Sequence, residues 1–327
     1  MRPGTPQEML SIIQSHNNIL KFKKYFYPPH LKALPVKMYF YRCMSLFITS
    51  LNSGSNGNCY YIGNATEAVL IDAGLSCKET EKRMRQLNLP IEKVKAIFIS
   101  HEHTDHIKGL AGLVSKFALP YYITAGTFKR SGLVIGQSPL WFTAFQPINI
   151  GSIAVTAFPK YHDAADAHSF ILSHQGVTVG VFTDIGKPCE RIIHYFSQCH
   201  CAFLEANYDE NMLENGRYPI YLKNRIRGGH GHLSNRQALD LFIAHKPAFM
   251  THLLLAHLSK ENNHPQLVQD LFNKHAKDTR VIVASRYEPS EVLAIQLTKT
   301  DIIPVPIATH KKERRRTLHT NQLSLFD

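Results

Sequence analysis

The strongest constraint on the fold of this chain of 327 residues is a cluster of four metal-binding side chains within six positions. An apolar run, Ile97-Phe98-Ile99, is followed by His101, His103, Asp105 and His106. These donors converge only if the chain turns sharply where a buried strand ends. Neutral imidazoles and a carboxylate suit Zn²⁺ or Mn²⁺, with Fe²⁺ as a further candidate. A solvated polar loop would not need four such donors. The cluster therefore predicts a metal site at the end of a strand.

Four donors do not complete the ligand shells of two metal ions, so further ligands are expected at other strand ends. Four apolar runs each end on such a side chain: Asp72, His162, Asp184 and His257. His168 and His252 compete for two of these positions. We rank them lower, because His168 follows a polar loop and His252 precedes its strand.

Composition places the chain among soluble globular proteins of the cytoplasm. A hydrophobic content of 44% in a chain of this length is enough for a large core. The six cysteines are scattered without C-x-x-C spacing, which argues against a disulfide framework and predicts reduced thiols. No apolar run approaches the roughly 18 residues of a membrane span, so we expect no membrane partner. The first ten residues lack the apolar centre of a signal peptide.

The net charge of +12 suggests a polyanionic partner, but the charge is uneven along the chain. Residues 1–43 carry seven Lys and Arg against one acid, and residues 301–327 carry five against three. We expect three parts: a basic N-terminal extension (1–43) outside the fold, one large domain (44–300), and a basic linker with a C-terminal tail (301–327). Met44 is the expected physiological start, and a disordered basic arm is the alternative.

Short apolar runs separated by Gly, Asn and Ser predict strands, and 3.6-residue periodicity predicts helices. Strands are expected at 45–51, 59–62, 68–72, 96–100, 121–124, 153–158, 177–183, 202–205, 253–256 and 281–284. Helices are expected at 78–87, 106–116, 235–245 and 264–273. The segment 53–58, Ser-Gly-Ser-Asn-Gly-Asn, predicts a tight hairpin. The alternation of strands and helices predicts an α/β domain.

A second polar cluster, Gly228-Gly229-His230-Gly231-His232-Leu233-Ser234-Asn235, precedes a predicted helix. Backbone N–H groups at a helix N-terminus attract phosphate, so Ser234 and Asn235 are predicted to bind a phosphate group. His232 is predicted to protonate a leaving oxygen, because imidazole titrates near neutral pH. Helix capping alone is the alternative for Ser234 and Asn235.

The ordered set of strand-end ligands resembles the five motifs of the metallo-β-lactamase superfamily over roughly residues 44–300. The resemblance implies a single-domain αββα four-layer sandwich with two divalent metal ions. It implies that the first ion is held by His101, His103 and His162, and the second by Asp105, His106 and His257. Asp184 would bridge the two ions, and Asp72 would accept an imidazole N–H and fix the ligand tautomer. The residues predicted to be catalytic are Asp105, Asp184 and His232.

A narrower resemblance rests on four segments: 53–59, 162–164, 231–235 and 255–263. Together they are similar to the bacterial WalJ/YycJ-type nucleases. The resemblance implies a 5′-to-3′ exonuclease that acts on duplex DNA in replication-linked mismatch repair. Two metal ions roughly 3.5–4 Å apart clamp the attacking and leaving oxygens of a phosphoryl displacement, which agrees with phosphodiester hydrolysis.

Spacing disfavours RNA-processing relatives of this fold. Only about 70 residues separate Asp184 from His257, which leaves no room for the helical domain of ribonuclease J relatives. About 20 residues separate His162 from Asp184, which argues against the tRNA-gripping arm of ribonuclease Z. Two alternatives stay open: a small-molecule metallo-hydrolase of the same fold (a cyclic phosphodiesterase or thioester hydrolase), and a non-catalytic metal-binding repair adaptor.

The chain ends in Gln322-Leu323-Ser324-Leu325-Phe326-Asp327 after a basic and polar linker. Exposed apolar side chains at a flexible end contribute nothing to solubility, so a pocket should receive them. The segment resembles the peptide by which bacterial replication and repair proteins bind the sliding clamp. That resemblance implies that Gln322, Leu323, Leu325 and Phe326 contact the clamp. Docking on the protein's own core is the alternative.

Overall fold

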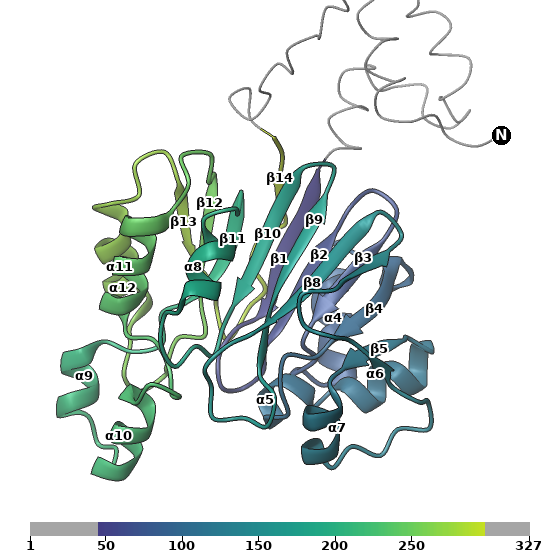
Figure 1. The fold of residues 1–327 in the computed structure, drawn as a ribbon, viewed down its shortest axis with the longest axis horizontal. Coiled ribbons are helices and arrows are strands. Elements are labelled where there is room, and N and C mark those ends of the chain that lie inside the picture. The colour runs from purple at the N-terminus through teal and green to yellow at the C-terminus, as the bar shows by residue number, and fades with distance from the viewer. Residues whose placement is uncertain (1–44, 298–327) are drawn as a thin grey trace, which may run out of the picture.

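Two facing β-sheets form the centre of residues 45–297, the part of the chain that the computed structural model describes (Figure 1). In spatial order the first sheet comprises β14 (Leu293–Ile295), β1 (Leu46–Asn52), β2 (Cys59–Gly63), β3 (Ala68–Ile71), β4 (Val94–Phe98), β5 (Tyr121–Ile123) and β6 (Leu140–Trp141). The second comprises β13 (Arg280–Val283), β12 (His252–Ala256), β11 (Cys201–Glu205), β10 (Val177–Phe182), β9 (His168–His174), β8 (Ile153–Pro159) and β7 (Pro147–Ile150).

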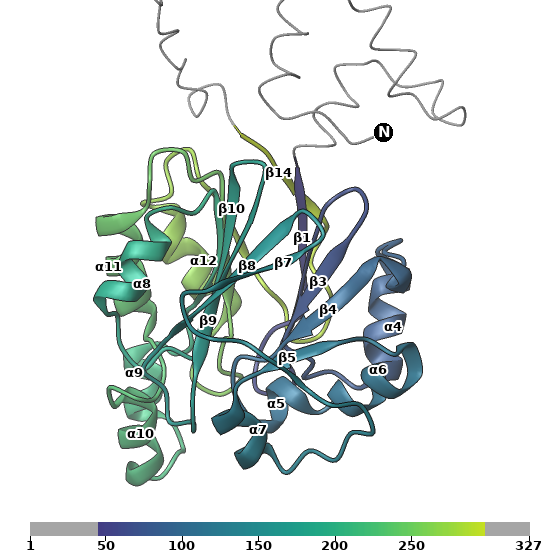
Figure 2. The same ribbon diagram turned by 45° about the vertical axis from the view of Figure 1, so that its right-hand side comes forward.

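Both sheets are mixed and follow the same plan. In the first, β14, β1, β2 and β3 pair antiparallel, whereas β3, β4, β5 and β6 pair parallel. In the second, β7 to β10 pair antiparallel, and β10 to β13 pair parallel. Figure 2 shows the two sheets face to face.

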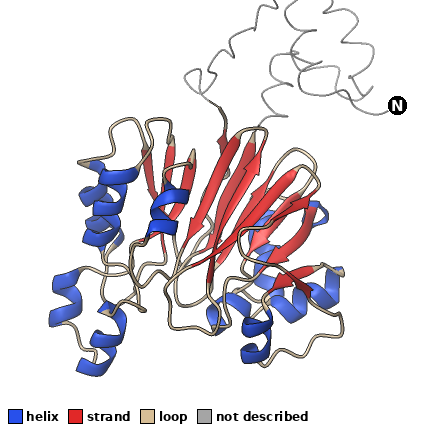
Figure 3. Ribbon diagram, viewed as in Figure 1, coloured by secondary structure: helices blue, strands red, loops and turns tan. Residues whose placement is uncertain are grey.

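Helices cover the outer faces of both sheets, so the described chain has four layers, αββα (Figure 3). The helices are α4 (Cys77–Gln86), α5 (Thr104–Ile107), α6 (Leu110–Phe117), α7 (Ala125–Ser131), α8 (Glu190–Phe196), α9 (Glu210–Asn215), α10 (Ile220–Arg227), α11 (Asn235–His245) and α12 (Pro265–Asn273), with a 3₁₀ turn at Ile91–Lys93. Helices α4 and α6 pack on the first sheet, and α8, α11 and α12 pack on the second. None of the helices within residues 45–297 has the length and apolar character of a membrane span.

The apolar runs of the sequence become strands that are buried on both faces. In β4, Ala96 and Phe98 point between the sheets, whereas Ile97 points to the helices of the first sheet. Successive side chains of a strand alternate between its two faces, so a strand covered on both sides needs apolar residues throughout. Across the gap, Phe98 contacts Phe170 of β9, with the ring centroids 5.9 Å apart.

All ten predicted strands are present, and the hairpin predicted at 53–58 joins β1 to β2. The predicted helix 106–116 is wrong as one element, because it divides into α5 and α6 at Gly109. A Cβ on Gly109 would lie 1.7 Å from the carbonyl oxygen of Leu75, so the chain passes too close there for any side chain. Strand β9 was not predicted, since only three apolar residues separate its polar ends.

Candidate metal centre

The predicted ligands meet at one end of the sandwich because most of them follow strands that run in the same direction. Asp72 follows β3, and the cluster that begins at His101 follows the parallel neighbour β4. Asp184 and His257 follow β10 and β12 of the second sheet. Carboxyl ends of parallel strands lie at one edge of a sheet, and ligands gather there. The site therefore lies in the seam between the two sheets, at the end of the molecule where α5 begins (Figure 1).

One group of donors consists of His101, His103 and His162. His103 Nδ1 lies 3.0 Å from His101 Nε2 and 3.3 Å from His162 Nε2. Four ligands around a zinc ion at about 2.0–2.1 Å are separated by about 3.4 Å in a tetrahedron, so these nitrogens stand at the spacing of ligands that share one ion. His162 Nδ1 donates to the carbonyl oxygen of Gly231 over 3.1 Å, which leaves the lone pair on Nε2 directed at the group.

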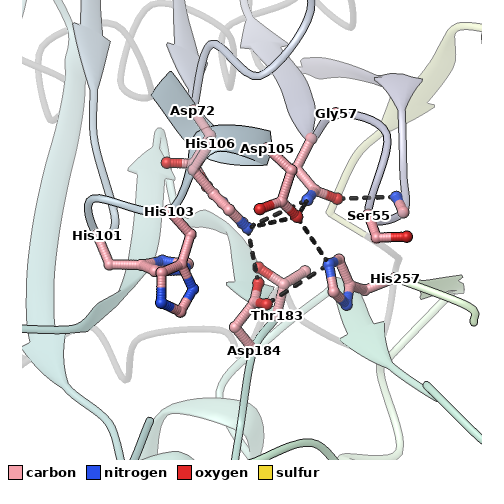
Figure 4. A network of polar contacts seen from close by, with 12 residues as sticks. Ser55, Gly57, Asp72, His101, His103, Asp105, His106, Thr183, Asp184 and His257 are labelled. Atoms are coloured by element: carbon pink, nitrogen blue, oxygen red, sulfur yellow. Dashed lines mark hydrogen bonds and ion pairs between the residues drawn. The ribbon is translucent and has the colours of Figure 1, made fainter. Parts of the chain in front are cut away.

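A second group consists of Asp105, His106 and His257 (Figure 4). Asp105 Oδ2 lies 3.4 Å from His106 Nε2 and 3.3 Å from His257 Nε2. Asp184 lies between the groups, with one oxygen 3.2 Å from His106 Nε2 and the other 3.5 Å from His257 Nε2 and 3.9 Å from His162 Nε2. The structure thus brings together all seven side chains that the sequence nominated as ligands.

The residues at this site fit a pair of divalent cations. Asp184 is buried, and its Oδ2 has no hydrogen-bond partner among the described residues. A buried carboxylate oxygen without a hydrogen bond is costly unless a cation compensates it. Asp184 also belongs to a donor set with His101 and His106, and to another with His257, so its carboxylate is shared by both groups. These contacts match those of a bridging ligand.

Three of the strand-end residues adopt a left-handed backbone conformation, which is uncommon for residues other than glycine. Asp72, Asp184 and His257 have φ values of 62°, 54° and 57°. Left-handed backbone is disfavoured for residues that carry a Cβ and is concentrated at functional sites. Here it turns each side chain from the end of its strand into the seam.

Asp72 fixes the orientation of the His106 ring through its contact with Nδ1. Its Oδ2 lies 2.7 Å from His106 Nδ1, and its Oδ1 accepts the backbone N–H of Ser100 over 2.8 Å. An acceptor at Nδ1 fixes the tautomer that leaves Nε2 free to bind a metal. The contact is the one expected of Asp72 from the resemblance.

Asn58 braces the same cluster from the hairpin after β1, and its role was not predicted. Its amide Nδ2 donates to Asp105 Oδ2 over 3.0 Å, and its backbone N–H donates to the carbonyl oxygen of Asp105. Gly74 makes this approach possible, since a Cβ there would lie 1.7 Å from Asp105 O. Asn58 belongs to the Ser-Gly-Ser-Asn-Gly-Asn segment, which was predicted only to form a tight hairpin. That segment was the one sequence feature that drew attention to this residue.

Glu205 is a second site residue that sequence reasoning missed. It ends β11, is fully buried, and its Oε1 lies 2.8 Å from His232 Nδ1 and 3.2 Å from His257 Nδ1. Its Oε2 accepts the backbone N–H groups of Ile185 and Leu233. The sequence signal was an acid at the end of an apolar strand, the same signal that identified Asp72 and Asp184.

Burial and neighbouring charges set different protonation states in the two donor groups. Burial lowers the pKa of His101 well below its ordinary value and lowers the pKa of His162 to about 3. Burial opposes the charged form of His257 as well, but the carboxylates of Asp184, Asp105 and Glu205 raise its pKa to about 10. His101 and His162 are therefore neutral and able to coordinate a cation, whereas a cation and a proton compete at His257.

His232 lies beside the metal ligands as predicted, and Glu205 holds it there. Its ring is stacked against His257, with the centroids 5.2 Å apart, and its Nδ1 lies 3.8 Å from Asp184 Oδ1. A carboxylate at Nδ1 orients an imidazole so that Nε2 presents the exchangeable proton. The side chain of His232 is 19% exposed, more than those of His162 and His257, so it can meet a substrate.

The structure corrects the phosphate-binding prediction for Ser234 and Asn235. Both side chains are buried. Ser234 Oγ accepts from the backbone N–H of Gln237 and donates to Glu210, in a capping box at the start of α11. Asn235 exchanges hydrogen bonds with the buried amide of Asn263. Their polar atoms are engaged within the fold, so capping accounts for Ser234 and packing accounts for Asn235.

The two competing histidines lie apart from the donor groups. His168 Nδ1 donates to the carbonyl oxygen of Asp166, and His252 Nδ1 contacts the hydroxyl of Thr251. Geometry thus selects His162 and His257, as the sequence ranking did. Gln322, Leu323, Leu325 and Phe326 lie outside the described residues.

Comparison with known proteins gives the same reading of the fold. Residues 53–176 match the metallo-beta-lactamase superfamily. The exodeoxyribonuclease YycJ of Bacillus anthracis is 35% identical over 230 residues, which cover 69% of this chain and 87% of that protein. The exodeoxyribonuclease WalJ of Streptococcus pneumoniae is 31% identical over 223 residues, which cover 66% and 83%.

Solved structures with low sequence identity share the architecture. The metallo-beta-lactamase fold protein YhfI of Bacillus subtilis superposes with a TM-score of 0.60 and 18% identity, over 76% of this chain and 99% of that one. The short form of human tRNase Z superposes with a TM-score of 0.52 and 17% identity, over 76% and 99%. These likenesses, with the family match, confirm the predicted metallo-β-lactamase αββα fold.

Proposed function

Because the chain belongs to the family of YycJ and WalJ exodeoxyribonucleases within the metallo-beta-lactamase superfamily, we propose that it is a dinuclear-metal phosphodiesterase that degrades duplex DNA from the 5′ end in replication-linked mismatch repair. Membership makes the chain a metal-dependent hydrolase. The observation that carries the finer proposal is the cluster of seven donors, in which buried Asp184 touches both groups.

In this proposal the first cation is held by His101, His103 and His162, and the second by Asp105, His106 and His257. Asp184 holds both. When bound, Zn²⁺ or Mn²⁺ supplies positive charge to the phosphate and a reactive water near neutral pH. The chain's own residues then have two tasks. Asp72 and Glu205 fix the ligand imidazoles, and His232 donates a proton to the oxygen that leaves.

An exposed arm beside the site supports a nucleic acid as the substrate. We call residues 216–232, which include α10, the α10 arm. It contains Arg217, Lys223, Arg225 and Arg227 and no acid, and none of the α10 residues is buried. Ile220 and Tyr221 are 62% and 72% exposed. Basic side chains interleaved with exposed apolar and aromatic ones are typical of surfaces that hold a phosphate backbone and stack on bases.

The α10 arm is tied to the metal centre by several contacts. Arg225 pairs with Asp163, the neighbour of His162. The backbone N–H of His232 donates to the carbonyl oxygen of Ile226 over 2.8 Å. Figure 1 shows α9 and α10 beyond the strand ends, at the same end of the molecule as α5. DNA on the arm would therefore lead toward the donor groups.

We expect the double substitution Arg217→Ala/Tyr221→Ala to weaken binding of duplex DNA with a single-stranded end by about 5- to 100-fold, because one stacking contact and one phosphate contact are lost. The slope of log K against log salt should also become shallower. Fluorescence anisotropy at several salt concentrations measures both. Hydrolysis of bis(p-nitrophenyl) phosphate should not change, and Arg236→Ala on the neighbouring α11 is the control. Unchanged DNA affinity would remove the arm from the substrate path.

The proposed activity is tested by offering the purified protein 5′-labelled duplex DNA, 3′-labelled duplex DNA, matching RNA and bis(p-nitrophenyl) phosphate, each with Mn²⁺ or Zn²⁺. A 5′-to-3′ exonuclease releases the 5′ label as mononucleotide at the earliest times and shortens the 3′-labelled strand progressively. Preferential cleavage of RNA would redirect the proposal to an RNA substrate. Cleavage of the small phosphodiester alone would favour a small-molecule hydrolase.

We extend the proposal to the segment 322–326, which we infer to bind the bacterial sliding clamp and so to raise the local concentration of the enzyme at replicating DNA. A peptide with this sequence should bind the clamp in the micromolar range, roughly −8 kcal/mol. Leu325→Ala/Phe326→Ala should abolish binding of the full chain in a pull-down or calorimetric titration, with nuclease activity on free DNA unchanged. If the clamp does not bind the intact protein, this part of the proposal fails.

A DNA substrate agrees with the cytoplasmic location that the scattered cysteines predict. The five cysteines among the described residues are free thiols.

A further inference from the structure

A pocket of about 470 Å³ lies next to the metal centre and outside it. Three segments form it, and each contributes a serine: Ser53 after β1, Ser259 after β12 and Ser285 after β13. Ser53 connects the pocket to the site, because its hydroxyl accepts the backbone N–H of His257 over 2.7 Å. The volume lies within the range of pockets that take small ligands, roughly 300–1,000 Å³.

The charged side chains that line this pocket are both cationic. They belong to Lys260 and Arg286, the imidazole of His264 lies beside them, and no Asp or Glu lines the pocket. Arg286 Nε is buried and has no hydrogen-bond partner among the described residues. The other end of the guanidinium is fixed by a hydrogen bond from Nη2 to Ser55 Oγ over 2.9 Å. A buried guanidinium donor without a partner is costly, and no Asp or Glu of the pocket neutralises the positive charge of Arg286, so the pocket favours an anionic ligand.

Other donors face the same space. The hydroxyl of Ser259 accepts from the backbone N–H of Asn262, and that of Ser285 accepts from the backbone N–H of Tyr287, so both hydroxyl protons are available to a ligand. His264 Nδ1 accepts from the backbone N–H of Gln266 at the start of α12, so Nε2 carries the proton. The positive end of α12 adds to the attraction for an anion.

We propose that this pocket binds the phosphomonoester of a nucleotide, with the phosphate against Arg286 and Lys260 and the base over Tyr287. Tyr287 lines the pocket and is 64% exposed, so its ring is open to stacking. The ligand is the 5′-phosphate of a DNA end or a free mononucleotide. The first source rests on the proposed function, and the chemistry of the pocket serves both.

The test is a calorimetric titration of the full-length protein with deoxyadenosine 5′-monophosphate and with deoxyadenosine. The monophosphate should bind more tightly than the nucleoside, and Arg286→Ala should weaken its binding by at least about tenfold. Lys260→Ala, on an exposed side chain, should weaken it less and without any effect on thermal unfolding. Lys274→Ala at the other end of α12 is the matched control and should bind as the wild type does.

A second experiment separates the two sources of the ligand. It compares the affinity of the protein for duplex DNA that carries a 5′-phosphate with its affinity for the same duplex with a 5′-hydroxyl. A preference for the phosphorylated end that disappears in Arg286→Ala assigns the pocket to DNA ends, and binding of the mononucleotide without such a preference assigns it to free nucleotide. Equal affinity for monophosphate and nucleoside overturns the proposal. The proposal is also overturned if the monophosphate still binds the Arg286→Ala and Lys260→Ala variants but no longer binds Asp184→Ala. In that case the ligand would bind at the metal centre. If DNA is not cleaved but Arg286-dependent binding persists, the nuclease assignment fails and the pocket stands.

Discussion

Replacement of Asp184 by alanine is expected to abolish hydrolysis of both DNA and bis(p-nitrophenyl) phosphate. The carboxylate lies between the two donor groups, within 3.2–3.9 Å of nitrogens of His106, His257 and His162. Without it, both donor groups would lose the negative charge that they share, so they would hold cations less well and lose the chemistry that bound cations would supply. Turnover should be measured together with metal content by atomic emission.

Two further variants make this result specific. Asp184→Asn keeps a residue type that tolerates the left-handed backbone at this position, whose φ is 54°, so a comparable loss of activity would trace the effect to charge rather than to backbone strain. Asp240→Ala, on the exposed surface of α11, should behave as the wild type does. Near-normal turnover of Asp184→Ala with reduced metal content would refute the two-metal mechanism.

His232→Ala should lower kcat by about 10²–10⁴-fold while the metal content stays at the wild-type level, because the side chain acts on the leaving oxygen and not on the cations. Glu205→Gln should lower kcat less, by roughly 10–100-fold, since it loosens the orientation of His232 and His257 without removing either ring. If the two residues act as one unit, the double variant should be no worse than His232→Ala.

The pH profile and metal analysis decide between roles for His232. A general acid gives a falling limb on the alkaline side of the kcat profile, and His232→Ala should remove it. His230→Ala, two residues earlier on the exposed loop, is the matched control. Loss of metal in His232→Ala would make this histidine a ligand, a role that its place in a donor set with Asp184, Glu205 and His257 permits.

The metal ligands were accessible to sequence reasoning because they obey one simple rule: each lies in the short segment that follows an apolar run. The rule holds because parallel strands bring their carboxyl ends to one edge. Glu205 obeys the same rule and was still missed, since it was counted as the last residue of its strand. Its partners, His232 and His257, come from other parts of the chain, and no local pattern pairs them with it.

Other features depended on contacts that a linear pattern does not record. Ser234 and Asn235 lie at a helix N-terminus, a position that favours both helix capping and phosphate binding. Only their hydrogen bonds to Glu210 and Asn263 show that both side chains are engaged within the fold. The break at Gly109 depends on a distant residue, because the backbone N–H of Gly109 donates to the carbonyl oxygen of Ala73 instead of continuing the helix. The basic pocket is built from three separate segments, so its charge is dispersed in the sequence.

The division of the donors between the two sheets makes metal supply part of the folding equilibrium. His101 to His106 belong to the first sheet, whereas His162, Asp184 and His257 belong to the second, so bound cations would tie the two halves together as a cross-link does. By mass action, a ligand that binds only the native state adds RT ln(1 + [L]/Kd), about 2.7 kcal/mol at a concentration 100 times its Kd. A cell short of zinc or manganese would then hold less of this enzyme in its folded form. Abundance as well as turnover would follow the metal, and proteolysis of the unloaded chain would set how long it lasts.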